Sequence, residues 1–291
     1  IRQDGIYIQR ELISIILLVF LCVPAFGQMT ANDWFDQGNA LALQGNFSGA
    51  INAYEEAIRL DPQYFRAWNN MGFLLREVGR YDEALSAFDR AVEIDPQYTM
   101  AWNNRGTTLA SLGRYEEAIL ACDKAIEIDP HGAVFWFNKA NSLSFLGRND
   151  EAVLAYDRAI ELDPQYEAAW YNKGAVLTDQ GRHEEAVQAY VEALKINPEN
   201  RGAWNNVGNA LAALGRYDEA LPAYDVAIRI SPGEADFWHN QGNALAELGR
   251  YDEAILAYEK AIELDPQDAD SWHNKGVALN LLNRTAEASV A

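Results

Sequence analysis

Residues 235–268 read ADFWHNQGNALAELGRYDEAILAYEKAIELDPQD, and this pattern recurs every 34 residues along a chain of 291. We number each copy from 1 to 34, so that its tryptophan stands at position 4. The copies begin at residues 31, 65, 99, 133, 167, 201, 235 and 269, and the last stops after 23 residues. Every tryptophan falls in this phase: Trp34, Trp68, Trp102, Trp136, Trp170, Trp204, Trp238 and Trp272. Such a period is typical of architectures in which successive units stack.

Each repeat carries the signals of two helices. Positions 4, 8 and 11 hold tryptophan, a small residue and leucine, and positions 20, 24 and 27 hold alanine, usually an aromatic residue, and alanine. Steps of three and four place each set on one face of a helix. Glycine at position 15, such as Gly249, permits a left-handed turn, and the pair Asp265 and Pro266 ends the second helix. The sequence therefore predicts an all-α fold of helix pairs, with helix A and helix B in each repeat.

The pattern resembles the tetratricopeptide-repeat (TPR) family, with tryptophan four residues before glycine, alanine at position 20, an aromatic at 24 and proline at 32. The resemblance covers residues 31–291 and implies a right-handed superhelical solenoid of antiparallel helix pairs, in which helix A lines the concave side. One departure is that cations stand at position 7, where the family usually has an apolar residue: Arg105, Lys139, Lys173 and Lys275. The expected organisation is a signal peptide at residues 1–27, a short linker at 28–30 and the solenoid at 31–291.

The N-terminal segment has the parts of a secretory signal peptide in order. Arg2 and Arg10 precede an apolar run at residues 12–23, and small residues lead to a plausible cleavage point after Gly27. We therefore expect an extracytoplasmic protein that is secreted, periplasmic or at the cell surface. If translation starts at Met29, the protein would instead be cytoplasmic.

The charge and the cysteine content narrow the choice of partners and of stabilising bonds. The formal net charge is −20 at pH 7, and a surface of this sign repels phosphate, which disfavours nucleic acids and anionic membranes. Removal of residues 1–27 would take Cys22 and leave Cys122 as the single thiol. We therefore expect a fold that is stabilised by packing, with no intrachain disulfide.

Position 6 of helix A is the first candidate for a binding surface. It is asparagine in seven consecutive repeats: Asn70, Asn104, Asn138, Asn172, Asn206, Asn240 and Asn274. An amide offers both donors and an acceptor, so a row of them can hold a peptide backbone with little sequence preference. The row resembles the asparagine ladder of O-linked N-acetylglucosamine transferases, which implies that it grips a polypeptide. The alternatives are capping or inter-repeat hydrogen bonds, or simple duplication of a neutral residue.

Positions 5 and 9 vary between repeats and are candidates for specificity in the groove. Phe137, Tyr171 and nearby Phe145 are expected to form an aromatic patch, with packing between neighbouring helices as the alternative. The remaining groove candidates at these positions are His239, His273, Asn141, Asn209 and Asn243.

The sequence gives little support to an enzyme. It has no Gly-x-Ser-x-Gly elbow, phosphate-binding loop or His-Glu-x-x-His motif, so we expect no catalytic activity, cofactor or small-molecule substrate. His239 and His273 share position 5, and Asp236 and Asp270 each precede them by one helical turn. Such a set can bind a divalent cation or sense pH, but duplication explains the repetition more simply, and we predict no metal site.

The preferred function is a protein–protein interaction scaffold that binds a polypeptide segment along the concave groove. The alternative is a structural spacer or self-assembling envelope component without a dedicated peptide ligand. Self-association would then use the C-terminal repeat, which stops early in helix B.

Overall fold

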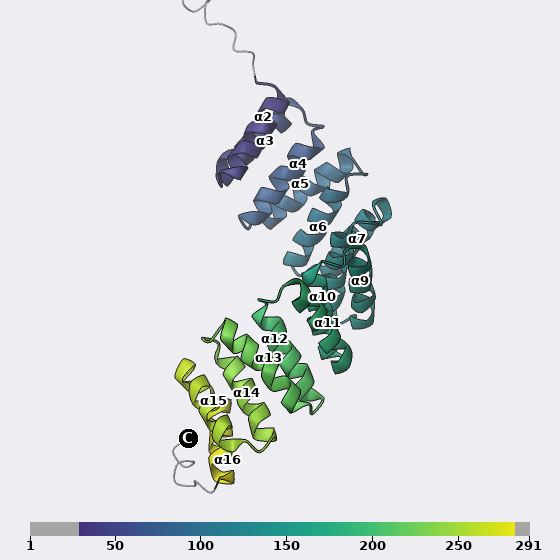
Figure 1. The fold of residues 1–291 in the computed structure, drawn as a ribbon. Coiled ribbons are helices and arrows are strands. Elements are labelled where there is room, and N and C mark those ends of the chain that lie inside the picture. The colour runs from purple at the N-terminus through teal and green to yellow at the C-terminus, as the bar shows by residue number, and fades with distance from the viewer. Residues whose placement is uncertain (1–28, 283–291) are drawn as a thin grey trace, which may run out of the picture. The chain divides into compact units, whose positions relative to one another are not determined.

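The computed structural model describes residues 29–282, and this range forms helices in pairs, with no strand (Figure 1). Helix A of each repeat has 13 residues: α2 (Ala31–Leu43), α4 (Phe65–Glu77), α6 (Thr99–Ser111), α8 (Ala133–Phe145), α10 (Glu167–Asp179), α12 (Arg201–Ala213), α14 (Ala235–Glu247) and α16 (Ala269–Leu281). Helix B has 14: α3 (Phe47–Leu60), α5 (Tyr81–Ile94), α7 (Tyr115–Ile128), α9 (Asn149–Leu162), α11 (His183–Ile196), α13 (Tyr217–Ile230) and α15 (Tyr251–Leu264). The predicted all-α solenoid of helix pairs is confirmed.

The turn between helix A and helix B depends on glycine at position 15. Gly249 has a φ of 72°, in the left-handed region that costs a side-chain-bearing residue free energy. The next amide, of Arg250, donates to the Leu245 carbonyl at 2.9 Å, which satisfies a carbonyl that the helix end leaves without a partner. Arg250 also forms an ion pair with Glu253 at 2.7 Å. The same exposed ion pair recurs in most repeats.

The turn after helix B is closed by the tryptophan at position 4. The indole Nε1 of Trp272 donates to the Pro266 carbonyl at 3.1 Å, and Trp68 donates to Pro62 at the same distance. Asp265 accepts a hydrogen bond from the backbone N–H of Gln267 at 3.0 Å. These tryptophans are half-buried. Each one therefore fills space between helices, and its indole hydrogen bond stabilises the turn that connects two repeats.

The small residue at position 8 makes room for the aromatic residue at position 24. A Cβ placed on Gly242 would lie 2.7 Å from the ring of Tyr258, closer than such atoms approach one another in practice. Tyr258 itself is 1% exposed. Helix A and helix B of one repeat therefore pack most closely where position 8 meets position 24.

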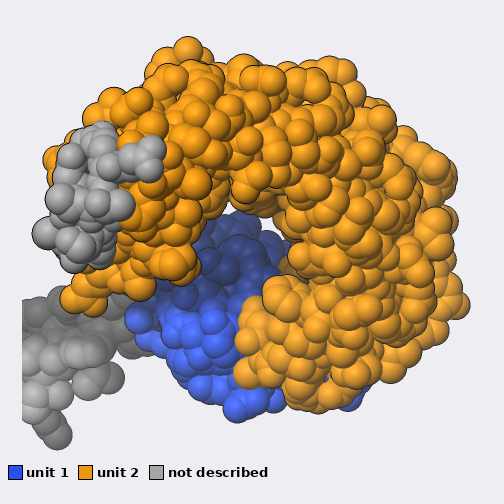
Figure 2. Space-filling model, turned by 90° about the horizontal axis from the view of Figure 1, so that it is seen from below, with its two compact units in different colours: residues 1–96 blue, residues 97–291 orange. Residues whose placement is uncertain are grey.

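The helices group into two compact units, residues 1–96 and 97–291. In the described part of the first unit, α2 to α5 enclose a core that includes Tyr54 and Phe88. In the second unit a larger core runs from Ile119 to Tyr258. Figure 2 shows this second unit, in orange, as an arc hollowed on its inner side.

The helices A line the inner side of this arc. Most neighbouring helices A of the second unit contact one another, such as α6 with α8 and α14 with α16, and neighbouring helices B make fewer contacts. The prediction that helix A lines a hollow face therefore holds within the second unit.

Several sequence predictions concern residues that the structure does not describe. The predicted signal peptide at residues 1–27 lies outside the described range, as does the segment in which helix B of the last repeat is expected. Within residues 29–282, none of the helices combines the length and the apolar character that a membrane span requires.

Candidate functional site

Most of the asparagines at position 6 link their repeat to the one before it. Within the second unit, Asn172 donates through Nδ2 to Asn141 Oδ1 at 2.9 Å and Asn274 donates to Asn243 at 2.9 Å. Three more reach position 5 of the preceding repeat: Asn138 donates to Asn103 at 2.8 Å, Asn240 to Asn205 at 3.1 Å and Asn206 to the Tyr171 hydroxyl at 3.3 Å. In the first unit, Asn70 donates to Asn39 at 3.1 Å. The row therefore has the inter-repeat role that the sequence left open as an alternative.

These bonds use only part of the hydrogen-bonding capacity of each of these six amides. An asparagine side chain has two N–H donors and an oxygen with two acceptor sites, and the inter-repeat bond uses one N–H. Except for Asn104, which is 8% exposed, the asparagines of the row are half-buried, so solvent reaches them. The half-buried amides thus join repeats and keep hydrogen-bonding groups that the inter-repeat bonds do not use.

Tyrosine at position 24 fixes how the asparagine at position 9 is turned. The Tyr258 hydroxyl donates to Asn243 Oδ1 at 2.8 Å, and the same oxygen accepts from Asn274. The group formed by Tyr156, Asn141 and Asn172 repeats this arrangement, with a tyrosine bond of 2.6 Å. With both acceptor sites of the oxygen occupied, the position 9 amide offers its NH₂ group to its surroundings.

The tyrosine and the asparagine occur together in the sequence, a signal that the sequence reasoning missed. Asparagine stands at position 9 in four repeats, and each of these has tyrosine at position 24: Asn39 with Tyr54, Asn141 with Tyr156, Asn209 with Tyr224 and Asn243 with Tyr258. Repeats without the hydroxyl have another residue at position 9, namely Phe73 with Phe88 and Thr107 with Cys122. Tyr190, opposite Ala175, instead has its hydroxyl 3.3 Å from Thr178.

The aromatic residues predicted to form one patch have separate partners. Phe137 lies 4.7 Å from Tyr166, measured between ring centroids. Tyr171 lies 5.7 Å from Tyr190. Phe145 stacks on Tyr115 at 4.9 Å with an angle of 7° between the rings. Phe137 and Tyr171 thus take part in packing between helices, whereas Phe145 is 71% exposed.

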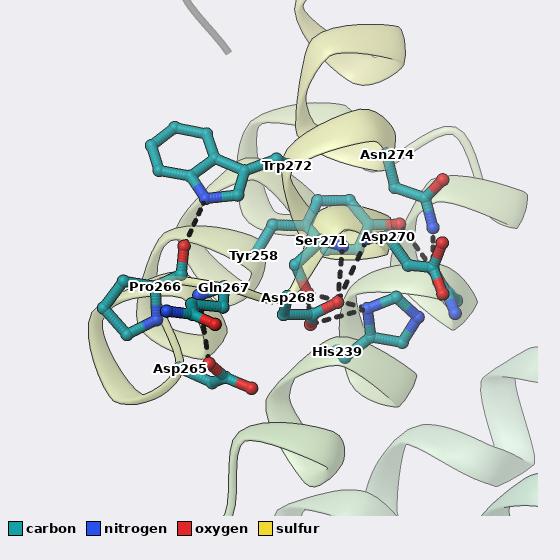
Figure 3. A network of polar contacts seen from close by, with 11 residues as sticks. His239, Tyr258, Asp265, Pro266, Gln267, Asp268, Asp270, Ser271, Trp272 and Asn274 are labelled. Atoms are coloured by element: carbon teal, nitrogen blue, oxygen red, sulfur yellow. Dashed lines mark hydrogen bonds and ion pairs between the residues drawn. The ribbon is translucent and has the colours of Figure 1, made fainter.

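The two histidines at position 5 also differ in their surroundings. His239 Nδ1 lies 2.7 Å from Ser271 Oγ and 3.6 Å from Asp268 Oδ2, at the start of α16 (Figure 3). Burial opposes ionisation of Asp268, but hydrogen bonds from Ser271, the charge of the nearby His239 and a hydrogen bond from the Asp270 backbone together outweigh it and lower the pKa of this carboxyl. His273 is exposed. Within residues 29–282, no three His, Cys, Asp or Glu side chains are arranged to hold a metal ion.

The cations at position 7 form a second link between repeats, away from the asparagine row. Lys139 pairs with Asp123 at 2.6 Å, and Lys275 pairs with Glu259 at 3.0 Å. In each case the acid is at position 25 of the preceding helix B. The Lys275 ammonium also lies 5.6 Å from the centre of the Trp272 ring, within reach of a cation–π interaction. This explains why a cation can replace the family's usual apolar residue.

Two clefts open over the asparagine row in the second unit. The larger, of about 540 Å³, lies across α12, α14 and α16, and its lining includes Asn240, Asn243, Asn274, Tyr251 and Glu247. The smaller, of about 310 Å³, lies between α6 and α8, and it is lined by Asn138, Asn141 and the stacked pair of Tyr115 and Phe145, among others. The asparagine row is therefore hollowed at these two places.

Family models match nearly all of the described chain. The tetratricopeptide repeat model matches residues 35–99, 70–133, 137–201 and 179–235. A second model of the same description matches residues 223–256, and a TPR repeat model matches 242–282. No curated protein sequence matches the chain.

Solved structures with the same fold include other repeat proteins. YrrB, described as a TPR protein with an unusual peptide-binding site, is 26% identical with a TM-score of 0.60, over 66% of this chain and 98% of that one. MamA is 25% identical with a TM-score of 0.54, over 59% and 94%. A tetratricopeptide repeat protein from Parabacteroides merdae is 17% identical with a TM-score of 0.61, over 89% and 100%, and shows the fold alone.

Proposed function

Because the chain belongs to the tetratricopeptide-repeat family, whose members generally mediate protein–protein interaction, we propose that it is a scaffold that holds a polypeptide segment along its helices A. The observation that carries this proposal is the row of half-buried asparagines, each with part of its amide capacity left over. The peptide-binding site named for YrrB adds support from a protein of similar fold. Fold alone does not determine function in such families, so the proposal depends on the row.

The chemistry of the row suits a peptide backbone. A peptide group has one N–H and one carbonyl oxygen, and an amide side chain matches both whatever side chains the ligand carries. The inter-repeat bonds hold the amides in place before a ligand arrives, so less conformational entropy is lost on binding. We therefore expect broad recognition of extended segments, with specificity added in the clefts.

The test compares the full chain with two triple variants in a peptide-library binding assay. The first variant changes Asn172, Asn240 and Asn274 to alanine, which removes one inter-repeat bond at each position. The matched control changes Lys139, Lys173 and Lys275 to methionine, which removes one inter-repeat ion pair at each position. Both variants lose three links between repeats, but only the first removes groups from the row.

We expect peptide binding to be lost in the asparagine variant and kept in the lysine variant, with both retaining helical circular dichroism. Equal binding by all three proteins would show that the row is purely structural. If no protein binds any peptide and the full chain instead associates with itself in sedimentation experiments, the alternative of a self-assembling spacer would replace the scaffold.

We also propose an extracytoplasmic location, supported by the charged start, apolar run and small residues within residues 1–27. Expression in a cell with a secretory pathway, followed by N-terminal sequencing, tests this. A secreted product that begins at Gln28 is the expected result. A product that stays in the cytoplasm with its N-terminus intact would contradict the proposal.

A further inference from the structure

The larger cleft combines features that point to a defined kind of peptide, if the proposed peptide binding is correct. It lies where α14 and α16 approach each other, and it holds about 540 Å³. Its lining provides three kinds of group: amides, apolar side chains and one carboxylate.

Two of the asparagines that line the cleft, Asn243 and Asn274, place a donor group beside an acceptor group. Asn243 Oδ1 already accepts from Tyr258 at 2.8 Å and from Asn274 at 2.9 Å, so Asn243 offers its NH₂. Asn274 has used one N–H in this contact and retains its oxygen. Both residues line the cleft. A donor beside an acceptor matches the carbonyl and the N–H of an extended backbone.

The apolar part of the lining is exposed to solvent. Val277 is 44% exposed and Leu281 is 55% exposed, and both line the cleft together with Tyr251. The equivalent positions of the preceding repeat hold the polar residues Asn243 and Glu247. An aliphatic side chain of a ligand would remove this apolar surface from water, which is the main source of favourable free energy for such a contact.

Glu247 gives the cleft its charge. It is the only charged residue in the lining, and within residues 29–282 it has no ion-pair partner, unlike Glu253, which pairs with Arg250. Its negative charge and, more strongly, burial raise the pKa of Tyr258 to about 12, so its field reaches the hydroxyl that orients Asn243. A cationic side chain of the ligand would provide the missing counter-charge.

We infer that this cleft binds an extended peptide segment that carries an aliphatic side chain next to a lysine or arginine. The backbone would pair with Asn243 and Asn274, the aliphatic side chain would cover Val277 and Leu281, and the cation would face Glu247. The smaller cleft has no charged residue in its lining. It would therefore accept apolar segments without preference for charge.

The test measures fluorescence anisotropy of labelled ten-residue peptides with the full chain. The peptides share a glycine and serine background and carry leucine with lysine, leucine with glutamate, or serine with lysine at the centre. The protein variants are Glu247→Gln and the matched control Asp179→Asn, an exposed carboxylate at the same position of helix A in another repeat.

We expect the leucine–lysine peptide to bind about three- to fivefold more tightly than the leucine–glutamate peptide, the size typical of a partly exposed ion pair. Glu247→Gln should abolish this preference, and Asp179→Asn should preserve it. Replacement of leucine by serine should weaken binding in every protein.

The outcomes separate this inference from the proposed function. If the peptides bind with no dependence on charge, or if Glu247→Gln leaves the preference intact, the inference is overturned and the peptide-binding proposal stands. If none of the peptides binds to the full chain and the wider library gives no ligand either, both are overturned.

Discussion

Repeats 3 and 7, both in the second unit, have the same helix lengths but different residues between their helices. Position 24 is Cys122 in repeat 3 and Tyr258 in repeat 7, and both are buried. In repeat 7, Tyr258 orients Asn243, which then accepts from the next repeat. Repeat 3 has no asparagine at position 9, and the position 6 asparagine of the following repeat, Asn138, donates to Asn103 at position 5 instead. The repeat thus folds with or without the tyrosine hydroxyl.

The difference shows that building the repeat and orienting the amides are separate tasks. Packing of position 8 against position 24 serves the first, since a Cβ on Gly106 would lie 3.0 Å from Cys122 Sγ and one on Gly242 would lie 2.7 Å from the Tyr258 ring. The hydroxyl serves the second, and it is found only where position 9 can use it or Thr178 lies nearby. Variants at position 24 should therefore affect stability and binding to different extents.

The largest expected effect comes from truncating the side chain at position 24, and it should differ between repeat 7 and repeat 3. Tyr258→Ala removes a buried ring and should lower the free energy of unfolding by about 3–5 kcal/mol, as aromatic truncations do. Cys122→Ala removes one sulfur atom and should cost about 1 kcal/mol. Urea denaturation followed by circular dichroism measures both, and equal costs would contradict the account of the core.

A smaller loss of stability is expected when the pH is raised, and we expect it to come from the thiol of Cys122 in repeat 3. Burial raises the pKa of the Cys122 thiol to about 12, whereas an unfolded thiol has a pKa of about 8.5. The folded chain therefore keeps its full stability at a pH below the pKa of the unfolded thiol. As the pH rises from there toward the pKa of the folded thiol, the free energy of unfolding falls by about 1 kcal/mol per pH unit.

The comparison for this test is between the original chain and Cys122→Ala, in urea denaturation at pH 8 and pH 10. Cys122→Ala should lose less stability over this interval. Tyr258→Phe should behave like the original chain up to pH 10, because an unfolded tyrosine has a pKa of about 10. Identical pH profiles for the original chain and Cys122→Ala would contradict burial of the neutral thiol.

The smallest expected effect is a favourable coupling free energy between two substitutions that reproduce the arrangement of repeat 7 in repeat 3. Cys122→Tyr and Thr107→Asn together should create the hydroxyl bond that either change alone lacks. A double-mutant cycle should give a favourable coupling of about 1 kcal/mol, the usual net value of a hydrogen bond. A coupling of zero would mean that the tyrosine and the asparagine occur together for another reason.

The sequence predicts the helices well because their ends depend on local residues. Glycine at position 15 and the Asp-Pro pair determine the turns, and the helix bounds follow in every described repeat. The contacts of the site could not be read in this way, since Asn274 meets Asn243 across 31 residues and Lys275 meets an acid in the preceding helix B. The pairing of tyrosine with asparagine within repeats was a usable signal for part of the site.

The sequence does not predict that the aromatic residues lie apart, for a related reason. Phe137 and Tyr171 share position 5 in neighbouring repeats, which suggests a common surface. Each ring instead packs on a different tyrosine, Phe137 on Tyr166 and Tyr171 on Tyr190. Which neighbour a ring meets depends on rotamer and helix spacing, and neither is encoded in the repeat pattern.

The central claim is that the asparagine side chains of the row contact a bound peptide. The most direct measurement is NMR of the full chain labelled with ¹⁵N at asparagine, in which the side-chain NH₂ signals of Asn243 and Asn274 are assigned by substitution. Saturation with a peptide selected from the library should shift these signals, and Tyr258→Phe should reduce the shift at Asn243. Unchanged side-chain signals in the presence of a peptide that demonstrably binds would contradict the account.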